Sequence, residues 1–556
     1  MSKYAYPRRF FSEERRWPSA ELTSSPAWCA VDLRDGNQAL SSPLTPQAKE
    51  TYFNLLLAVG FKEIEIGFPA ASIDEWTFCR GLIEEGKIPN DVTVSVLSQA
   101  REHIIARTMD ALRGVRRGIC HIYVPMSELH REFVLHETKE ELRERVLASV
   151  RQVRALAQEM KESEILLEFS PEEFTDSDLP EVASLCDEVV RCWKPARGEK
   201  VIINLPATVE RALPNHYPDM IERFCELAKQ RKSMIVSLHA HNDMGGAVAS
   251  TELALLAGAE RVEGTLFGNG ERCGNVDLVT LAMNLQYLGL DVGLDFSWLE
   301  RLSAEYTELT GLPVAPRQPY AGALVFTTFS GSHQDAIHKA LNEQKAIQER
   351  FGGWKLPYFH IDPTDVGRTF DGAIRINSQS GKGGIAHVLS ESYGIQLPDE
   401  MLAELATHVQ KRADATGGEV RPEEVWQIFL REFDCQEEPL RLVNYWPRPD
   451  KKDPSKILAE VHLLYGGERW ILRGAGDGPV AAFADAIRRV KLPPFRLLNY
   501  EERSIGTTVN AEAITVVSLE NDHRVWYGVG FGANIVHGAA RAIISGLNRM
   551  MRGQTK

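Results

Sequence analysis

The length, composition and charge of the chain exclude several classes of protein. Its 556 residues are several times a typical domain of roughly 100 to 200 residues, so two to four hydrophobic cores are expected. Hydrophobic residues at 44% and charged residues at 25% are ordinary for a folded globular protein and argue against a disordered or collagen-like chain. The net charge of −14 offers no basic surface for nucleic acid, so no nucleic-acid partner is expected.

Cysteine spacing and the lack of long apolar runs indicate a cytoplasmic protein. The eight cysteines are scattered and form no C-x-x-C pair, which is typical of a reducing compartment. No apolar run approaches the roughly 18 to 20 residues of a membrane helix, so no membrane association is expected. Arginines at positions 8, 9, 15 and 16 hint at an organelle transit peptide, but Glu13 and Glu14 lie among them.

Short β-branched runs alternate with longer helical patterns from Trp28 to about Leu288. The eight predicted strands are 28–35, 63–69, 92–99, 119–125, 165–171, 201–207, 235–243 and 261–268. Apolar residues at three and four spacing predict helices between them, such as 46–59, 137–160 and 278–288. Eight such units in roughly 260 residues match a closed (βα)8 TIM barrel, with an open doubly wound α/β sheet as the alternative.

Polar residues cluster where the predicted strands end. In a TIM barrel the carboxyl ends of the strands carry the active site, so these side chains are expected at one mouth. They are Arg34, Asp35, Gln99, Glu168, Thr208, His239, His241 and Asn269.

The strand rhythm stops after about Gly311, where three prolines mark an irregular connector. A helix is predicted over 329–350, glycines return at 378–384, and helical segments continue to about Phe433. We therefore expect four regions. They are an N-terminal arm at 1–27, a catalytic barrel at 28–322, a helical subdomain at 323–433 and a C-terminal α+β regulatory domain at 434–556.

The C-terminal region contains an internal βα repeat. Seven residues recur in identical form 56 positions later, from Trp470 and Gly474 in the first copy to Trp526 and Gly530 in the second. Each copy predicts strands, a glycine turn and a helix, and two copies could bury both helices against one sheet. The glycines either let a helix N-terminus approach a ligand's carboxylate or only shape the ends of strands.

The sharpest local motif is HAHND at 239–243. His239 and His241 are two residues apart on a predicted strand, so both imidazoles point to the same face. Two imidazoles and a carboxylate form a divalent metal site with positions left open for substrate oxygens. Asp35 is the preferred carboxylate, because strands one and seven lie close together around an eight-membered ring; Asp243 and Asn275 are weaker candidates. The alternative is a structural pair of histidines bonded to carbonyl groups.

Arg34 directly precedes Asp35, and at a strand end both side chains can reach the mouth. A guanidinium beside a metal suits a 2-keto acid, because the cation chelates the keto and carboxylate oxygens while the arginine donates hydrogen bonds. The alternative for Arg34 is a surface ion pair.

Several long motifs in order resemble those of the 2-isopropylmalate synthase family, in its longer form. They are LRDGNQAL (33–40), GFPAAS (67–72), NLPATVE (204–210), HAHNDMGGAVA (239–249), GNGERCGNVDL (268–278), FSGSHQDA (329–336) and NSQSGKGG (377–384). The resemblance implies a TIM barrel, a helical subdomain and a C-terminal leucine-binding domain. It also implies condensation of acetyl-CoA with 3-methyl-2-oxobutanoate and water to give 2-isopropylmalate and CoA.

The resemblance further implies roles for individual residues. The divalent metal, Mg, Mn or Zn, would be held by Asp35, His239 and His241, with Asn275 as a fourth ligand or close neighbour. Arg34 would hold the keto acid and Thr208 its carboxylate, while Glu168, His333 and Tyr358 fall at positions associated with catalysis. In a homodimer, His333 and Tyr358 would reach the partner subunit's barrel; otherwise His333 caps a helix and Tyr358 only packs. Leucine would bind near Gly474, Gly476, Gly530, Gly532 and Asn534.

Three other functions remain open at this stage. Homocitrate synthase and citramalate synthase differ in the 2-keto acid, and one methyl group contributes only about 1 to 3 kcal/mol of discrimination. Acyl-CoA carbon–carbon lyases lack the extended C-terminal half. A non-enzymatic metabolite sensor would need a broken metal set, whereas Asp35, His239 and His241 are all present.

Overall fold

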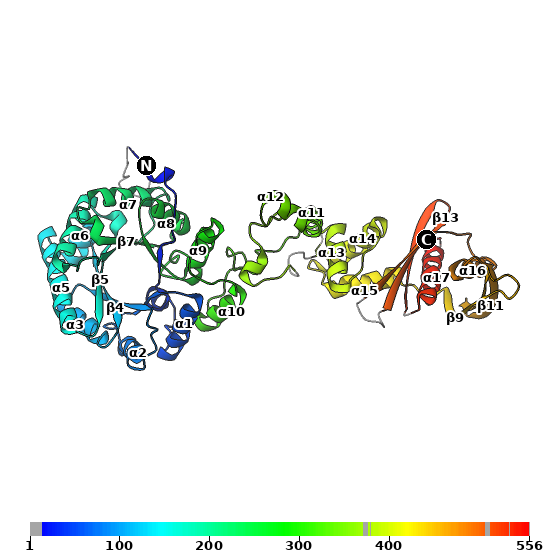
Figure 1. Cartoon of the computed structure of the whole chain (residues 1–556), viewed down its shortest axis with the longest axis horizontal. Helices are drawn as coiled ribbons and strands as arrows, with labels where there is room; N and C mark the ends of the chain where they lie inside the picture. The colour runs from blue at the N-terminus through cyan, green and yellow to red at the C-terminus, as the bar shows by residue number, and fades with distance from the viewer. Residues whose placement is uncertain (1–13, 371–375, 378–379, 506–511, 533, 555–556) are drawn as a thin grey trace. The chain divides into compact units, whose positions relative to one another are not determined.

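The computed structural model describes residues 14–370, 376–377, 380–505, 512–532 and 534–554. These residues form two compact units, each described by itself (Figure 1). The first comprises Met1–Val325 with Thr364–Arg368, and the second comprises Phe326–Pro363 with Thr369–Lys556. Residues 1–13 of the predicted arm and residues 378–379 of the glycine-rich motif lie outside the described residues. The four predicted region boundaries stay predictions.

The first unit contains a closed barrel of eight parallel strands, in the order β1 to β8. Cys29 of β1 pairs with Glu63 of β2 on one side and with Glu263 of β8 on the other, which closes the ring. The predicted TIM barrel is confirmed, and an open sheet is excluded. The strands are β1 (Ala27–Ala30), β2 (Glu63–Gly67), β3 (Thr93–Gln99), β4 (Arg117–Pro125), β5 (Glu164–Glu172), β6 (Val201–Ala207), β7 (Met234–Ala240) and β8 (Arg261–Gly264).

Helices surround the barrel, and local sequence explains where they begin and end. Thr45 caps α1 by accepting a hydrogen bond from the Ala48 N–H, and Gly60 ends the helix with φ of 111°. Thr138 and Glu141 form a capping box at the start of α5. The helices are α1 (Pro46–Val59), α2 (Ile73–Glu84), α3 (Glu102–Ala111), α4 (Glu128–His130), α5 (Lys139–Glu159), α6 (Leu179–Trp193), α7 (His216–Leu227), α8 (Ala247–Leu256), α9 (Leu278–Tyr287) and α10 (Leu299–Thr310).

The first strand is shorter than predicted. It ends at Ala30, and the chain then forms a single π-helical turn, η2 (Asp32–Gly36), so Asp35 does not lie on a strand. Asp32 fixes this turn, because its buried Oδ1 accepts hydrogen bonds from the Tyr52 hydroxyl and the Leu266 N–H. Side-chain hydrogen bonds of the turn replace the backbone hydrogen bonds that a longer strand would form. A pattern of β-branched residues alone does not reveal where this change occurs.

The second unit begins with five helices. They are α11 (Gly331–Asn342), α12 (Gln344–Phe351), α13 (Lys382–Tyr393), α14 (Asp399–Thr416) and α15 (Pro422–Phe433). The helix predicted over 329–350 is therefore two helices. Their buried core includes Leu389, Leu405 and Phe429 and extends to Val529 of the following domain. Because a Cβ at Gly383 would lie 2.8 Å from the backbone Cα of Asp335, glycine lets α13 approach α11 closely here.

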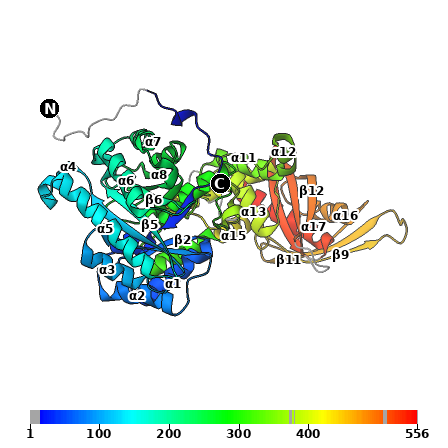
Figure 2. The same ribbon diagram turned by 60° about the vertical axis from the view of Figure 1, so that its left-hand side comes forward.

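The C-terminal region repeats one pattern of three strands and a helix, which confirms the internal repeat. The first copy is β9 (Leu440–Pro449), β10 (Ile457–Tyr465), β11 (Glu468–Gly476) and α16 (Pro479–Arg488). The second copy is β12 (Arg496–Ile505), β13 (Glu512–Asn521), β14 (Arg524–Gly532) and α17 (Ile535–Gln554). The strands form two antiparallel three-stranded sheets, so the expectation of one shared sheet is wrong. Each helix packs on its own sheet, and Figure 2 shows α17 along β12–β14.

Candidate active site

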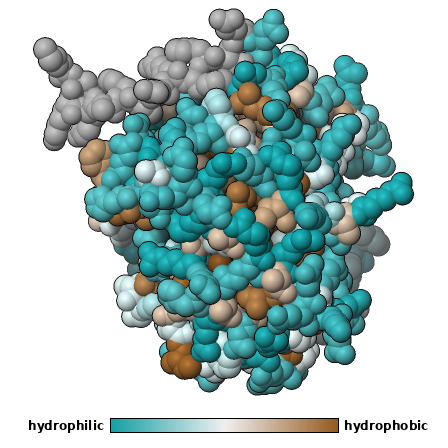
Figure 3. Space-filling view, turned by 90° about the vertical axis from the view of Figure 1, so that its left-hand side faces the viewer, coloured by the Kyte–Doolittle hydropathy of each residue, from teal (hydrophilic) through white to brown (hydrophobic). Residues whose placement is uncertain are grey.

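A cavity of about 190 Å³ opens at the carboxyl ends of the barrel strands. Arg34, Asp35, Thr208, His239 and His241, all predicted as site residues, are among the residues that line it. The face of the molecule drawn in Figure 3 is mostly hydrophilic, with separate small hydrophobic patches.

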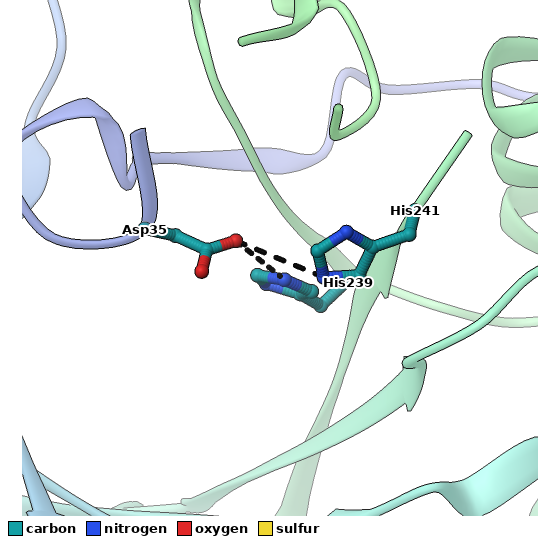
Figure 4. Close-up of side chains that lie close together, drawn as sticks. All are labelled: Asp35, His239 and His241. Carbon is teal, nitrogen blue, oxygen red and sulfur yellow. Dashed lines mark ion pairs between the residues drawn. The ribbon is translucent and has the colours of Figure 1, made fainter. Parts of the chain in front are cut away.

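Asp35, His239 and His241 converge at this mouth (Figure 4). Their ligand atoms all lie within 4.8 Å of one another, and all three residues are buried. Asp35 Oδ2 lies 3.4 Å from His239 Nε2 and 3.8 Å from His241 Nε2. Asp35 comes from the η2 turn, His239 from the end of β7 and His241 from the residue after that strand, so the predicted group is assembled by elements about 200 residues apart.

The charges around this group favour an ionised carboxylate. Burial opposes ionisation of Asp35, but the Arg34 guanidinium and the two imidazoles hold the pKa of its carboxyl below the usual value. His239 is buried, yet hydrogen bonds to Asp35 and Glu263 raise its pKa to about 9. Burial and the neighbouring His239 lower the pKa of His241 to about 4. Asp35 and Glu263, whose carboxyl pKa values are both lowered, thus place negative charge beside the histidines, which favours a cation there.

Asn275 lies directly beside the group. Its Nδ2 donates to Asp35 Oδ2 at 2.8 Å, and it forms an isolated backbone bridge with His241. Its buried Oδ1 and the buried His241 Nδ1 have no hydrogen-bond partner among the described residues. Asp243, the weaker alternative, instead pairs with Arg272 at 2.7 Å.

The donor set fits a divalent cation. A carboxylate, two imidazole nitrogens and a nearby amide form a mixed oxygen and nitrogen site of the kind that binds Mg, Mn or Zn. An unpaired amide oxygen next to such a set is a further potential ligand. The group therefore has the chemistry of a metal site rather than of histidines bonded to carbonyl groups.

Arg34 is held in place inside the cavity. Its Nη1 donates to Asp35 Oδ1 at 2.9 Å and its Nε to Glu65 Oε2 at 2.5 Å, and its side chain is only 11% exposed. The alternative of a surface ion pair is therefore wrong. Two carboxylates fix the guanidinium beside the metal group, where it can donate to a bound keto acid.

Thr208 also lines the cavity. Its Oγ1 accepts the Glu173 N–H at 2.8 Å, which leaves its hydroxyl proton available to donate to a substrate oxygen.

Glu173 has φ of 58°, a strained value for a residue with a side chain. Its buried carboxylate accepts hydrogen bonds from Ser127 Oγ and from His130 Nδ1, the latter at 2.6 Å.

Glu168 does not line the cavity. It is fully buried within the barrel, where its Oε1 pairs with Arg261 Nη1 at 2.9 Å. Burial raises the pKa of Glu168 well above the usual value. Glu172, four residues further along β5, does line the cavity, and burial together with the Glu173 carboxylate raises its pKa. Sequence reasoning missed Glu172, although it shares the face of Glu168 through the period of two in a strand.

Sequence reasoning also missed a chain of buried polar residues, of which His121, Ser170 and Asn204 line the cavity. Side-chain hydrogen bonds connect Arg34 through Glu65, His121, Ser170 and Asn204 to Glu263, which contacts His239. Each of these five linking residues lies on a barrel strand. The only sequence signal was a polar residue inside an otherwise apolar strand, as in EIEIG at 63–67.

His333 and Tyr358 belong to the second unit. Their rings stack with centroids 3.8 Å apart and planes 19° apart, and Tyr358 is 62% exposed with φ of 66°. The two side chains thus form one stacked aromatic pair, in which Tyr358 is exposed and His333 is half-buried. Their part in the barrel reaction stays a prediction.

The predicted regulatory residues have a packing role in this structure. A Cβ at Gly474, Gly476 or Gly530 would lie 2.3 to 2.6 Å from backbone atoms of the adjoining helix. A Cβ at Gly532 would make only ordinary van der Waals contacts, the nearest at 3.6 Å, and Asn534 Oδ1 accepts the Val536 N–H at 3.0 Å at the start of α17. Close contact between strand and helix therefore explains the first three glycines, while leucine binding stays a prediction for all five residues.

Comparisons with known proteins agree with this architecture. Three family models match in order: HMGL-like over residues 25–305, alpha-isopropylmalate synthase post-catalytic domain-like over 323–390, and LeuA allosteric (dimerisation) domain over 419–551. The 2-isopropylmalate synthase of Ralstonia nicotianae is 44% identical over 539 residues, covering 97% of this chain and 92% of that protein. The chain belongs to the 2-isopropylmalate synthase family. The 2-isopropylmalate synthase of Clostridium acetobutylicum is 42% identical over 553 residues, covering 99% of each chain.

Membership of the 2-isopropylmalate synthase family confirms the resemblance drawn from the motifs. The LeuA domain also bears out the expectation of an allosteric C-terminal domain. All eight cysteines are free, and no helix among the described residues is long and apolar enough to cross a bilayer.

Proposed function

We propose that this chain is an acyltransferase that condenses acetyl-CoA with 3-methyl-2-oxobutanoate and water to give 2-isopropylmalate and CoA, the first committed step of leucine biosynthesis. The observation that carries the proposal is the convergence of Asp35, His239 and His241 with Arg34 at the barrel mouth. Relatives named 2-isopropylmalate synthase match nearly the whole chain, including its C-terminal half. That extended half argues against a simple acyl-CoA lyase.

A divalent cation held by Asp35, His239 and His241, with Asn275 beside it, would polarise the keto oxygen and stabilise the alkoxide that forms there. Arg34 donates to the keto acid from the same side, since two carboxylates already fix its direction. Thr208 donates its hydroxyl proton to the substrate carboxylate. These groups make the keto carbon electrophilic and orient it.

The methyl group of acetyl-CoA is a weak carbon acid, so a base must remove its proton while the enolate oxygen is stabilised. Glu172 is the best-placed carboxylate on the barrel for proton transfer, because it lines the cavity and has a raised pKa. Glu168, His333 and Tyr358 remain proposed for catalysis. His333 and Tyr358 would act on the partner subunit's barrel in a homodimer.

The C-terminal domain would bind leucine and slow the reaction. Support comes from the match to the LeuA allosteric (dimerisation) domain, which also favours a homodimer. Gly474, Gly476, Gly530, Gly532 and Asn534 are the proposed leucine-binding residues. A cytoplasmic location is consistent with eight free cysteines.

The test is release of CoA thiol by the purified chain with acetyl-CoA and Mg²⁺ or Mn²⁺, against a panel of 2-keto acids. We expect 3-methyl-2-oxobutanoate to be preferred; a clear preference for 2-oxoglutarate or pyruvate would instead indicate homocitrate or citramalate synthase. Asp35→Ala should abolish the reaction. Asp91→Asn, which removes an exposed carboxylate paired with Lys62, is the matched control and should keep it. Repeating the assay with leucine tests the regulatory proposal.

A further inference from the structure

One metal-site histidine has a buried carboxylate behind it and the other does not. His239 Nδ1 lies 2.9 Å from Glu263 Oε2, and Glu263 is 1% exposed. His241 Nδ1 is buried with no hydrogen-bond partner among the described residues. The two imidazoles are thus oriented by different means, although His239 lies in β7 and His241 directly follows that strand.

The contact with Glu263 determines which nitrogen of His239 faces the cavity group. An ionised carboxylate only accepts hydrogen bonds, so Nδ1 must carry the proton. A neutral imidazole then presents the lone pair of Nε2, and Nε2 is the atom that lies 3.4 Å from Asp35 Oδ2.

Glu263 itself is held by two other donors. Arg261 Nη1 donates to its Oε1 at 2.9 Å, and Asn204 Nδ2 donates to its Oε2 at 3.0 Å. Arg261 is fully buried and also contacts Glu168 at 2.9 Å, Ser237 Oγ at 2.8 Å and Glu63 at 2.7 Å. The Glu263 carboxylate therefore keeps one rotamer and one charge state at the base of the site.

We propose that Glu263 is a positioning residue that fixes His239 with Nε2 as the metal-ligand atom, and that Arg261 and Asn204 hold Glu263 for this task. Carboxylates behind ligand histidines orient the ring and increase its basicity, and their loss typically costs about 10- to 100-fold in metal affinity. Glu168 shares Arg261 with Glu263 but is hydrogen-bonded to neither histidine of the metal group. The inference rests on the proposed metal site.

The test measures Mn²⁺ binding to the full-length apo chain by the loss of the free Mn²⁺ EPR signal. In Glu263→Gln the amide NH₂ group must face either the Arg261 guanidinium or the His239 Nδ1–H, and neither can accept a hydrogen bond from it. We therefore expect the Kd for Mn²⁺ to rise about 10- to 100-fold. Glu63→Gln is the matched control, since it removes another carboxylate that accepts from Arg261, at 2.7 Å, and contacts neither histidine of the metal group; its Kd should change by less than about threefold.

A double-mutant cycle separates positioning from a general loss of structure. In the His239→Ala background, Glu263→Gln should cause no further loss of Mn²⁺ affinity, because its effect passes through that ring. An equal loss in both backgrounds, or wild-type affinity in Glu263→Gln, would overturn the inference while leaving the metal site standing.

A second variant and a test of the metal site itself complete the experiment. Should Glu263→Gln fail to fold, Asn204→Ala replaces it in the same cycle: it changes no charge, removes one donor from Glu263 Oε2, and should weaken Mn²⁺ binding only when His239 is present. If the wild-type chain and Asp35→Ala bind Mn²⁺ equally weakly, the proposed metal site itself is wrong, and the role of Glu263 is lost with it.

Discussion

Replacing Gly530 by alanine tests whether the repeated glycines serve packing. A Cβ at Gly530 would lie 2.3 Å from the Gly538 oxygen and 2.5 Å from the Ala542 nitrogen, both backbone atoms of α17. No rotamer change can relieve contacts with backbone, so β14 and α17 must move apart. Overpacking of this kind typically costs about 1 to 3 kcal/mol, and two backbone clashes place Gly530→Ala at the upper end of that range or beyond.

Urea unfolding of the full chain, followed by far-UV circular dichroism, measures this effect. Gly532→Ala is the matched control in the same strand, since its nearest atom outside the adjacent residues is 3.6 Å away. We expect its free energy of unfolding to stay within about 0.5 kcal/mol of wild type. The packing argument fails if Gly530→Ala is as stable as Gly532→Ala. A stable Gly532→Ala chain that no longer responds to leucine would support the proposed effector site.

Three further predictions concern the barrel. Asp35→Asn removes the only carboxylate of the metal group, so Mn²⁺ affinity measured by titration of the apo chain should fall by at least about 10-fold. Glu172→Gln should lower kcat/KM about 10²- to 10⁴-fold if Glu172 transfers the proton, and should remove an acid limb whose pKa lies above the usual carboxyl value. Burial raises the pKa of Asp32 to about 7 from 3.8, so its contribution to the free energy of unfolding should fall by up to about 4 kcal/mol as pH rises from about 4 to 7.

Each of these predictions has its own control. Full Mn²⁺ affinity in Asp35→Asn would place the metal elsewhere. Glu168→Gln in the same kinetic assay distinguishes the two carboxylates of β5, and a larger loss there than in Glu172→Gln would reverse their roles. Asp32→Asn keeps the acceptor for Tyr52 and mimics the protonated acid, so the free energies of unfolding of wild type and variant should agree at low pH and diverge as pH rises from about 4 to 7. A constant difference across this pH range would refute the assignment to Asp32.

Much of the barrel could be predicted because its signals are local. The helix Pro46–Val59 and the strand Val201–Ala207 match their predicted ranges, since capping residues and apolar periodicity act over a few residues. The first strand was overextended because its last residues form a turn held by Tyr52 and the distant Leu266 N–H. The antiparallel sheets of the repeat were misjudged for a similar reason, since strand partners are chosen by tertiary packing.

The metal group could be predicted from spacing, whereas the depth of a residue inside the barrel could not. His239 and His241 share a face because side chains alternate along a strand. Glu168 and Glu172 share a face as well, but four residues separate them by roughly 13 Å along the strand. That distance places Glu172 at the cavity and Glu168 beside Arg261 in the interior.

The sequence by itself determined the family, the barrel, the repeat and the identity of the convergent acid and imidazoles, because motifs and periodicities are properties of neighbouring residues. Only the tertiary structure decided which charges neutralise one another inside the closed ring. The pairing of Glu263 with His239, Arg261 and Asn204 joins three strands. Such pairs depend on barrel closure and on strand register. A buried ionised side chain is stable only beside an opposite charge or a hydrogen-bond partner, and closure of the ring brings these partners together.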